Sequence, residues 1–223
     1  MGRNYFAMMK TKFTACFAIL AVCAPAAHAQ VEIPNLTQRE LRCQVNINEA
    51  TENYVRSSFT IRRDCFNMEM SGALGLEVDC TVNVDENNST GDPTTDELLR
   101  RASARLQTTI AGACINSDLE ILGFPGFCPA PEAGRAFDVF DLNGCLLDSS
   151  YELVEFLMDY EQPEVEEVFS RPDRACRDTI SEKSSRLFTG ELTARQTCLM
   201  RQLKGKVPPT VDCRLEELSL IHI

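Results

Sequence analysis

The chain has 223 residues, and its 33 acidic residues outnumber the 22 basic ones, giving a net charge of −11 at pH 7. An acidic surface repels phosphate, so we expect neither nucleic acid nor an anionic lipid surface as a partner. Only two histidines occur, His28 and His222, and both lie near the ends of the chain. Catalysis by Ser-His or Cys-His pairs and zinc held by histidine are therefore not expected.

The first 29 residues have the pattern of a cleavable secretory signal peptide. Two lysines precede an apolar run over 13–24, and Ala27-His28-Ala29 forms a small-x-small cleavage site. The run is shorter than the roughly 20 apolar residues that span a bilayer, and no second run of that length follows. We expect cleavage after Ala29 and export to the periplasm or the extracellular space. The mature chain would keep 33 acidic and 19 basic residues, a net charge of −14.

A first cysteine-rich unit, residues 30–163, begins with a long helical pattern. Thr37 and Glu40 form a capping box, and Gly72 is placed to act as the C-terminal cap. Between them, apolar residues recur with the spacing of one helix face. The residues expected on this buried face are Cys43, Ile47, Ala50, Tyr54, Ile61, Cys65 and Met68.

A polar loop, TVNVDENNSTGDP, follows at residues 81–93. Counted from Asp85, it is similar to an EF-hand calcium loop, but Gly91 and Glu97 each fall one position late. The same residue types are common in ordinary turns. We therefore expect no metal and no cofactor here.

The rest of the unit predicts two further helices. A second capping box, Thr94 to Glu97, starts a helix whose buried side is Leu99, Ala102, Leu106, Ile110 and Cys114. The segment LGFPGFCP at 122–129 predicts turns, and a shorter helix is expected over 150–160. Because alternating β-branched runs are scarce, we predict an all-α fold of disulfide-stapled helical hairpins.

A second, incomplete unit is expected over residues 164–217. Cys176, Cys198 and Cys213 repeat the spacing of Cys43, Cys65 and Cys80, 133 residues later, and ten of 38 aligned positions are identical. Ser170 is a candidate cap, Pro172 suits the first turn of a helix expected over 173–204, and Gly205 corresponds to Gly72.

An exported chain with this many cysteines is expected to form disulfides. Cys43 and Cys65 are 22 residues apart, about 33 Å along one helix, so they cannot pair with each other. An antiparallel hairpin favours Cys43 with Cys114 and Cys65 with Cys80, leaving Cys128 with Cys145. Six cysteines allow 15 connectivities, so other pairings stay open.

Cys176, Cys198 and Cys213 then form an unpaired set in the second unit. The helix that carries two of them also has an apolar face without a partner, made of Ile180, Leu187, Phe188 and Leu192. We expect disulfide-linked dimers as a result. The last six residues, 218–223 (LSLIHI), resemble translated sequencing-adapter sequence, so a non-native tail is expected there; a natural apolar tail is the alternative.

The repeated cysteine spacing, together with Leu-Gly-Phe-Pro-Gly-x-Cys at 122–128, resembles uncharacterised exported bacterial cysteine-rich helical repeat proteins. The resemblance covers residues 43–145 and restarts at 176. That group has no assigned activity, so the resemblance implies a fold style and a location. We expect a non-catalytic structural or binding module whose partner is a protein or a surface. The alternative is a carboxylate-dependent extracytoplasmic hydrolase, because glycoside hydrolysis needs only two carboxylates.

Overall fold

The computed structural model describes residues 36–75, 77–85, 87–132, 134–161, 171–208 and 210–213. The signal peptide, Ser170 and the 218–223 tail lie outside the described residues. Within them the chain forms helices and loops without a strand, which confirms the all-α class. The helices are α2 (Gln38–Met70), α3 (Pro93–Ala113), α4 (Asn116–Ile121), α5 (Val139–Glu161) and α6 (Arg171–Leu203).

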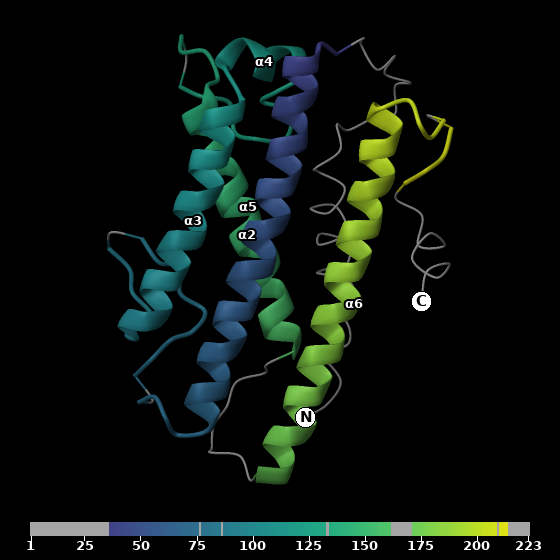
Figure 1. The fold of residues 1–223 in the computed structure, drawn as a ribbon. Coiled ribbons are helices and arrows are strands. Elements are labelled where there is room, and N and C mark those ends of the chain that lie inside the picture. Colours follow the sequence, from purple (N-terminus) through teal and green to yellow (C-terminus); the bar gives the residue numbers. More distant parts are fainter. Residues whose placement is uncertain are drawn as a thin grey trace, which may run out of the picture.

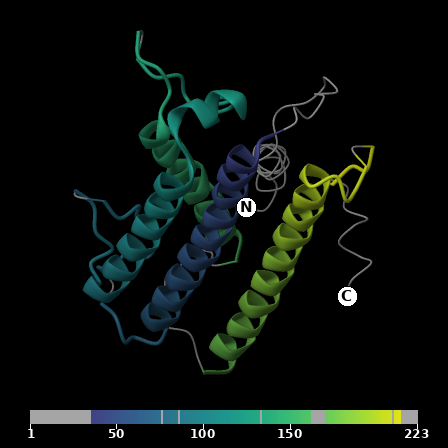
Figure 2. The ribbon, with the colours of Figure 1, turned by 45° about the horizontal axis from the view of Figure 1, so that its top comes forward.

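Helix α2 is the central element of the bundle. Figures 1 and 2 show α3 on one side of it and α6 on the other, both running antiparallel to α2, while α5 lies behind in the view of Figure 1. The short helix α4 sits at the end of the bundle where α2 begins (Figure 1). Two long neighbours thus cover opposite sides of α2.

The ends of α2 follow the sequence signals. The Thr37 hydroxyl accepts from the Glu40 backbone N–H at 3.3 Å, and the Glu40 carboxylate accepts from the Thr37 N–H at 2.7 Å. At the other end Gly72 has φ +74°, the left-handed conformation that costs glycine least. Its N–H donates to the Glu69 carbonyl and that of Ala73 to the Met68 carbonyl, as in a Schellman motif.

The predicted buried faces of α2 and α3 meet in one apolar cluster. It contains the α2 residues Cys43, Ile47, Ala50 and Tyr54 and the α3-side residues Ala102, Leu106, Ile110 and Cys114. The prediction is wrong for Met68, which is 36% exposed. A second face of α2 is also buried, because Val55 and Phe59 pack against α5 through Leu153, Val154 and Met158. A single stripe could not describe a helix that contacts two neighbours at different heights.

Helix α5 is about twice as long as predicted, because it starts at Val139 rather than near residue 150. Asp138 accepts from the backbone N–H groups of Phe140 and Asp141, at 2.8 and 3.0 Å, and so caps the early start. The buried Leu142 and Leu146 offset the helix cost of Gly144.

Three disulfides lie within residues 43–145: two join the pairs that the antiparallel hairpin favours, and the third joins the two cysteines that remained. They are Cys43–Cys114, Cys65–Cys80 and Cys128–Cys145, with Cα–Cα distances of 4.8, 5.8 and 5.6 Å. The first ties α2 to the end of α3, and the third ties the turn segment before α5 to α5 itself.

A buried arginine holds the loop that follows Cys80. Arg62 is 1% exposed and donates to the carbonyls of Cys80 and Val82, each at 2.8 Å. Its guanidinium lies 5.2 Å from the ring centroid of Tyr151, whose hydroxyl donates to the Thr81 carbonyl at 2.9 Å. Burial lowers the pKa of Arg62, although nearby tyrosine hydroxyl groups and carboxylates act to raise it. The loop is thus held between α2 and α5.

Removing the Cys43–Cys114 disulfide should destabilise the fold more than removing Cys65–Cys80, because it closes a 71-residue rather than a 15-residue separation. Chain entropy predicts losses of about 4 and about 3 kcal/mol. Urea unfolding of Cys43→Ala/Cys114→Ala and Cys65→Ala/Cys80→Ala, without reductant, measures both. The reverse order would mean that native-state packing dominates.

Replacing Arg62 by methionine leaves two carbonyls in the 80–82 loop without their donor. We expect the free energy of unfolding to fall by about 1.5–3 kcal/mol, the range for hydrogen bonds to a charged group. Arg101→Met is the control, since Arg101 is a surface residue paired with Glu97 and should cost less than about 0.5 kcal/mol. Similar losses for both variants in urea unfolding would contradict the role of Arg62.

Candidate functional site

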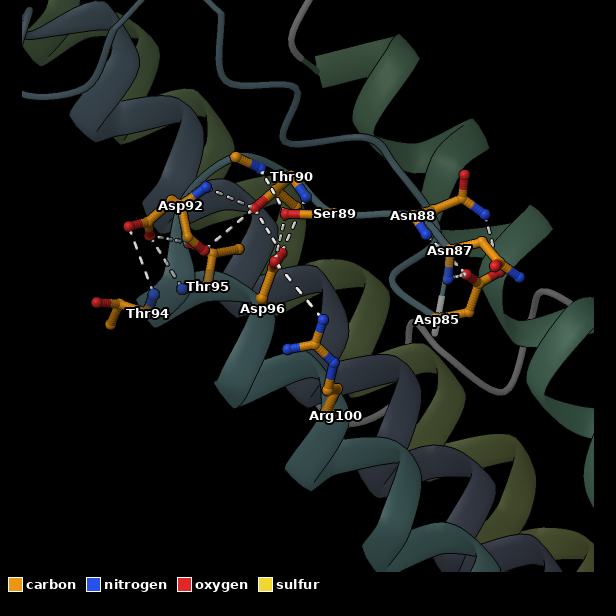
Figure 3. Close-up of polar contacts among 11 residues, drawn as sticks. Asp85, Asn87, Asn88, Ser89, Thr90, Asp92, Thr94, Thr95, Asp96 and Arg100 are labelled. Carbon is orange, nitrogen blue, oxygen red and sulfur yellow. Dashed lines mark hydrogen bonds and ion pairs between the residues drawn. The ribbon is translucent and has the colours of Figure 1, made fainter.

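The polar loop before α3 is the first candidate site, and its described carboxylates, Asp85 and Asp92, accept hydrogen bonds from the loop or from the first turn of α3 (Figure 3). One Asp85 oxygen accepts from the backbone N–H groups of Asn87 and Asn88, at 2.6 and 2.8 Å. These two backbone bonds and the Asn88 side chain lower the pKa of Asp85, the Asn87 bond contributing most. Asp85 therefore forms a turn rather than facing a shared centre.

Asp92 is the N-cap of α3. It accepts from the Thr95 hydroxyl at 2.6 Å and the Thr95 N–H at 2.9 Å, and these bonds lower its pKa. The prediction of a capping box from Thr94 to Glu97 is wrong, because the N-cap lies two residues earlier, at Asp92. Pro93 occupies the first helical position, where its missing N–H costs nothing, so the helix starts earlier. Glu97 instead pairs with Arg101 on the surface.

Asp96 is a buried carboxylate in the first turn of α3, and it contacts the loop. It accepts from the Ser89 hydroxyl at 2.5 Å and from the Thr90 hydroxyl and N–H at 2.7 and 2.9 Å, with Arg100 at 3.8 Å. Burial raises the pKa of Asp96, but the hydrogen bonds and Arg100 together lower it by more, so the net shift of the pKa is downward. The carboxylate joins the loop to the first turn of α3.

The geometry of the loop therefore supports a structural role. Asp85, Asp92 and Asp96 each face different donors instead of converging (Figure 3). Across the part of the chain that the structure describes, no group of three or more His, Cys, Asp or Glu side chains could hold a metal ion.

The second candidate site is α6, whose two long sides differ. Its inner side faces α2: the Thr193 hydroxyl donates to Glu52 at 2.7 Å, and the Gln196 amide donates to the Asn48 carbonyl at 3.2 Å. Phe188 packs against the cluster formed by α2 and α5. The expectation that Phe188 belongs to an apolar face without a partner is therefore wrong, and Leu192 is likewise partly buried.

The outer side of α6 carries exposed apolar residues. Ile180 is 56% exposed and Leu187 is 61% exposed, and Cys176 is exposed with a free thiol. The expectation that Ile180 and Leu187 lie on an apolar face without a partner is confirmed. Since Cys176, Ile180 and Leu187 fall within about 40° around a helix of 3.6 residues per turn, they form one stripe. We call these three residues the outer stripe of α6.

The set of unpaired cysteines is smaller than predicted. Cys198 and Cys213 form a disulfide with a Cα–Cα distance of 5.6 Å, and among the described cysteines this leaves Cys176 free. The Gly205 turn after α6, which repeats the turn at Gly72, brings Cys213 back to Cys198. The sequence spacing of 15 residues, shared with Cys65 and Cys80, could have indicated this pair.

Comparison with protein-family models, curated proteins and solved structures finds no match for this chain. Among the described helices, none is both long enough and apolar enough to cross a membrane.

Asp96→Asn tests the structural role of the loop. With a folded-state pKa below its ordinary value of about 3.9, the carboxylate stabilises the fold above about pH 4, and this contribution is lost as the pH falls through the folded pKa. We expect the variant to lose about 2 kcal/mol at pH 7, and the difference from the unsubstituted protein to shrink in acid. Urea unfolding across pH measures this.

Glu97→Gln is the matched control, because Glu97 is exposed and should change stability by less than about 0.5 kcal/mol. An equal loss for Asp96→Asn at pH 7 and at acid pH would show that the charge is not used. A rise in the melting temperature on adding calcium would contradict the structural role.

Proposed function

We propose that the mature chain is an extracytoplasmic structural or binding module whose helices are kept in place by disulfides. The observation that carries this proposal is the set of four disulfides, which involve α2, α5 and α6 and the segments that follow α2, α3, α4 and α6. Disulfides persist in oxidising compartments and are rare where thiols are kept reduced. The signal-peptide pattern at residues 1–29 independently supports export.

We further propose that the module is built from a repeated unit. Helices α2 and α6 both have 33 residues, and their bounds differ by 133 at each end. Each is followed by a glycine with positive φ, Gly72 at +74° and Gly205 at +65°, and by a disulfide that spans 15 residues. This agreement of helix length, cap and disulfide supports duplication of one structural unit. Repeated units stack side by side and present extended faces to partners.

A binding role is favoured over catalysis by the outer stripe of α6. Exposed apolar side chains in a row are typical of surfaces that bind another molecule. When no partner is present, the exposed Cys176 thiol is positioned to link two chains as a disulfide dimer. No specific contact of the described carboxylates favours the hydrolase alternative.

Expression of the full chain in an exporting bacterial host tests this proposal. We expect the secreted protein to start at Gln30 and to yield the four disulfides in non-reducing peptide mapping. Part of it should run as a dimer that reductant or Cys176→Ser abolishes. Retention of residues 1–29, or recovery of Cys43, Cys114, Cys198 and Cys213 as free thiols, would contradict an exported disulfide module.

A further inference from the structure

The contact between α2 and α3 shows what covers the positions of α2 that correspond to the outer stripe of α6. Cys43, Ile47 and Tyr54 of α2 are at most 5% exposed, because α3 lies on them. Cys43 forms the disulfide with Cys114 at the end of α3. Since the two helices are antiparallel, this bond sets Ala50 of α2 level with Gln107 of α3.

The same positions of α6 are uncovered. Adding 133 to Cys43, Ile47 and Tyr54 gives Cys176, Ile180 and Leu187, which are the outer stripe. Cysteine and isoleucine are identical in the two helices, and leucine replaces tyrosine. Figure 2 shows α6 at the edge of the bundle, with α2 beside it. Its inner contacts with α2 and α5 leave the stripe to face outward.

The stripe differs from its counterpart at one charged position. Lys183 is exposed between Ile180 and Leu187 and stands where α2 has Ala50. A lysine can lay its methylene groups along apolar surface while its ammonium reaches the rim. A helix covering the stripe would therefore be complementary in charge if it carried a carboxylate level with Lys183.

We propose that the outer stripe of α6 binds a separate amphipathic helix of the α3 type, whose cysteine forms a disulfide with Cys176. The inference rests on the repeat put forward under the proposed function. The partner helix runs antiparallel to α6, has apolar residues four apart like Ala102, Leu106 and Ile110, and carries an acidic residue level with Lys183. At its remaining positions, the sequence of the partner helix can differ from that of α3.

The covalent step is a thiol–disulfide exchange. The Cys176 thiolate attacks the sulfur of the partner cysteine, which is held in a mixed disulfide with a small thiol. The new S–S bond forms as the old one breaks, and the small thiol leaves with the electron pair. No further oxidant is needed.

A peptide corresponding to residues 92–115 of this chain is the probe, with its Cys114 activated as a pyridyl disulfide. We expect it to label Cys176 of the intact secreted protein at least about tenfold faster than a scrambled peptide of equal composition and the same cysteine position, because docking raises the effective concentration of the disulfide. The rate of the reaction is measured by the release of thiopyridone. Equal rates for the two peptides would overturn the proposal.

Two variants locate the effect on the helix. Ile180→Asp/Leu187→Asp should remove the rate advantage, whereas Ala175→Asp should keep it, because the exposed Ala175 lies about 100° around the helix from Cys176. Unchanged rates in Ile180→Asp/Leu187→Asp would also overturn the proposal. The export and mapping experiment does not depend on this result, so the two proposals can fail separately.

A charge exchange tests the register. The Gln107→Glu peptide should label Cys176 faster than the Gln107→Lys peptide, Lys183→Glu should reverse this order, and high salt should weaken both effects. The Cys176→Ser variant lacks the thiol, so binding of the peptide to it can be measured without the covalent step. We expect this variant to bind the peptide non-covalently. If Cys176→Ser instead forms a stable dimer that Ile180→Asp/Leu187→Asp separates, a second copy covers the stripe and the proposal is wrong.

Discussion

The disulfide between Cys43 and Cys114 sets the register in which α2 and α3 pack, and the other helices are arranged around that contact. It brings the start of one helix to the end of the other, so that Ile47 and Tyr54 meet the apolar side of α3. A slip of one turn would stretch the S–S bond beyond its narrow geometry and expose this cluster. The covalent bond and the apolar contacts therefore support the same arrangement.

Charged groups in this fold stabilise loops and turns. Arg62 donates to two carbonyls of the segment after Cys80, and Asp96 accepts from Ser89 and Thr90 at the end of the same connection. Together they hold the middle and the end of the connection between α2 and α3. Because a buried charge is costly unless it is hydrogen-bonded, these contacts also oppose other paths for the connection.

Helices α2 and α6 show how one helical pattern serves two environments. In α2 one face packs on α3 and another on α5, so little apolar surface remains outside. In α6 the polar contacts of Thr193 and Gln196, together with Phe188, help attach the helix to α2 and α5. The outer stripe consequently remains exposed.

Much of the fold follows from local rules that the sequence displays. The capping box at Thr37, the glycine turn at Gly72, the buried side of α3 and the favoured cysteine pairs all depend on helix spacing and on residues close in the chain. The early start of α5, the two-sided burial of α2, the cap at Asp92 and the placement of Arg62 under Tyr151 were not predicted. The two helix starts depend on which side chain meets the first free N–H groups, Asp92 for α3 and Asp138 for α5. The two-sided burial of α2 and the placement of Arg62 depend on which helices become neighbours. The same holds for α6: its sequence identified the apolar residues, but only the tertiary structure decided that Phe188 faces inward while Ile180 and Leu187 face out, because burial depends on the neighbours of a helix and not on its own periodicity.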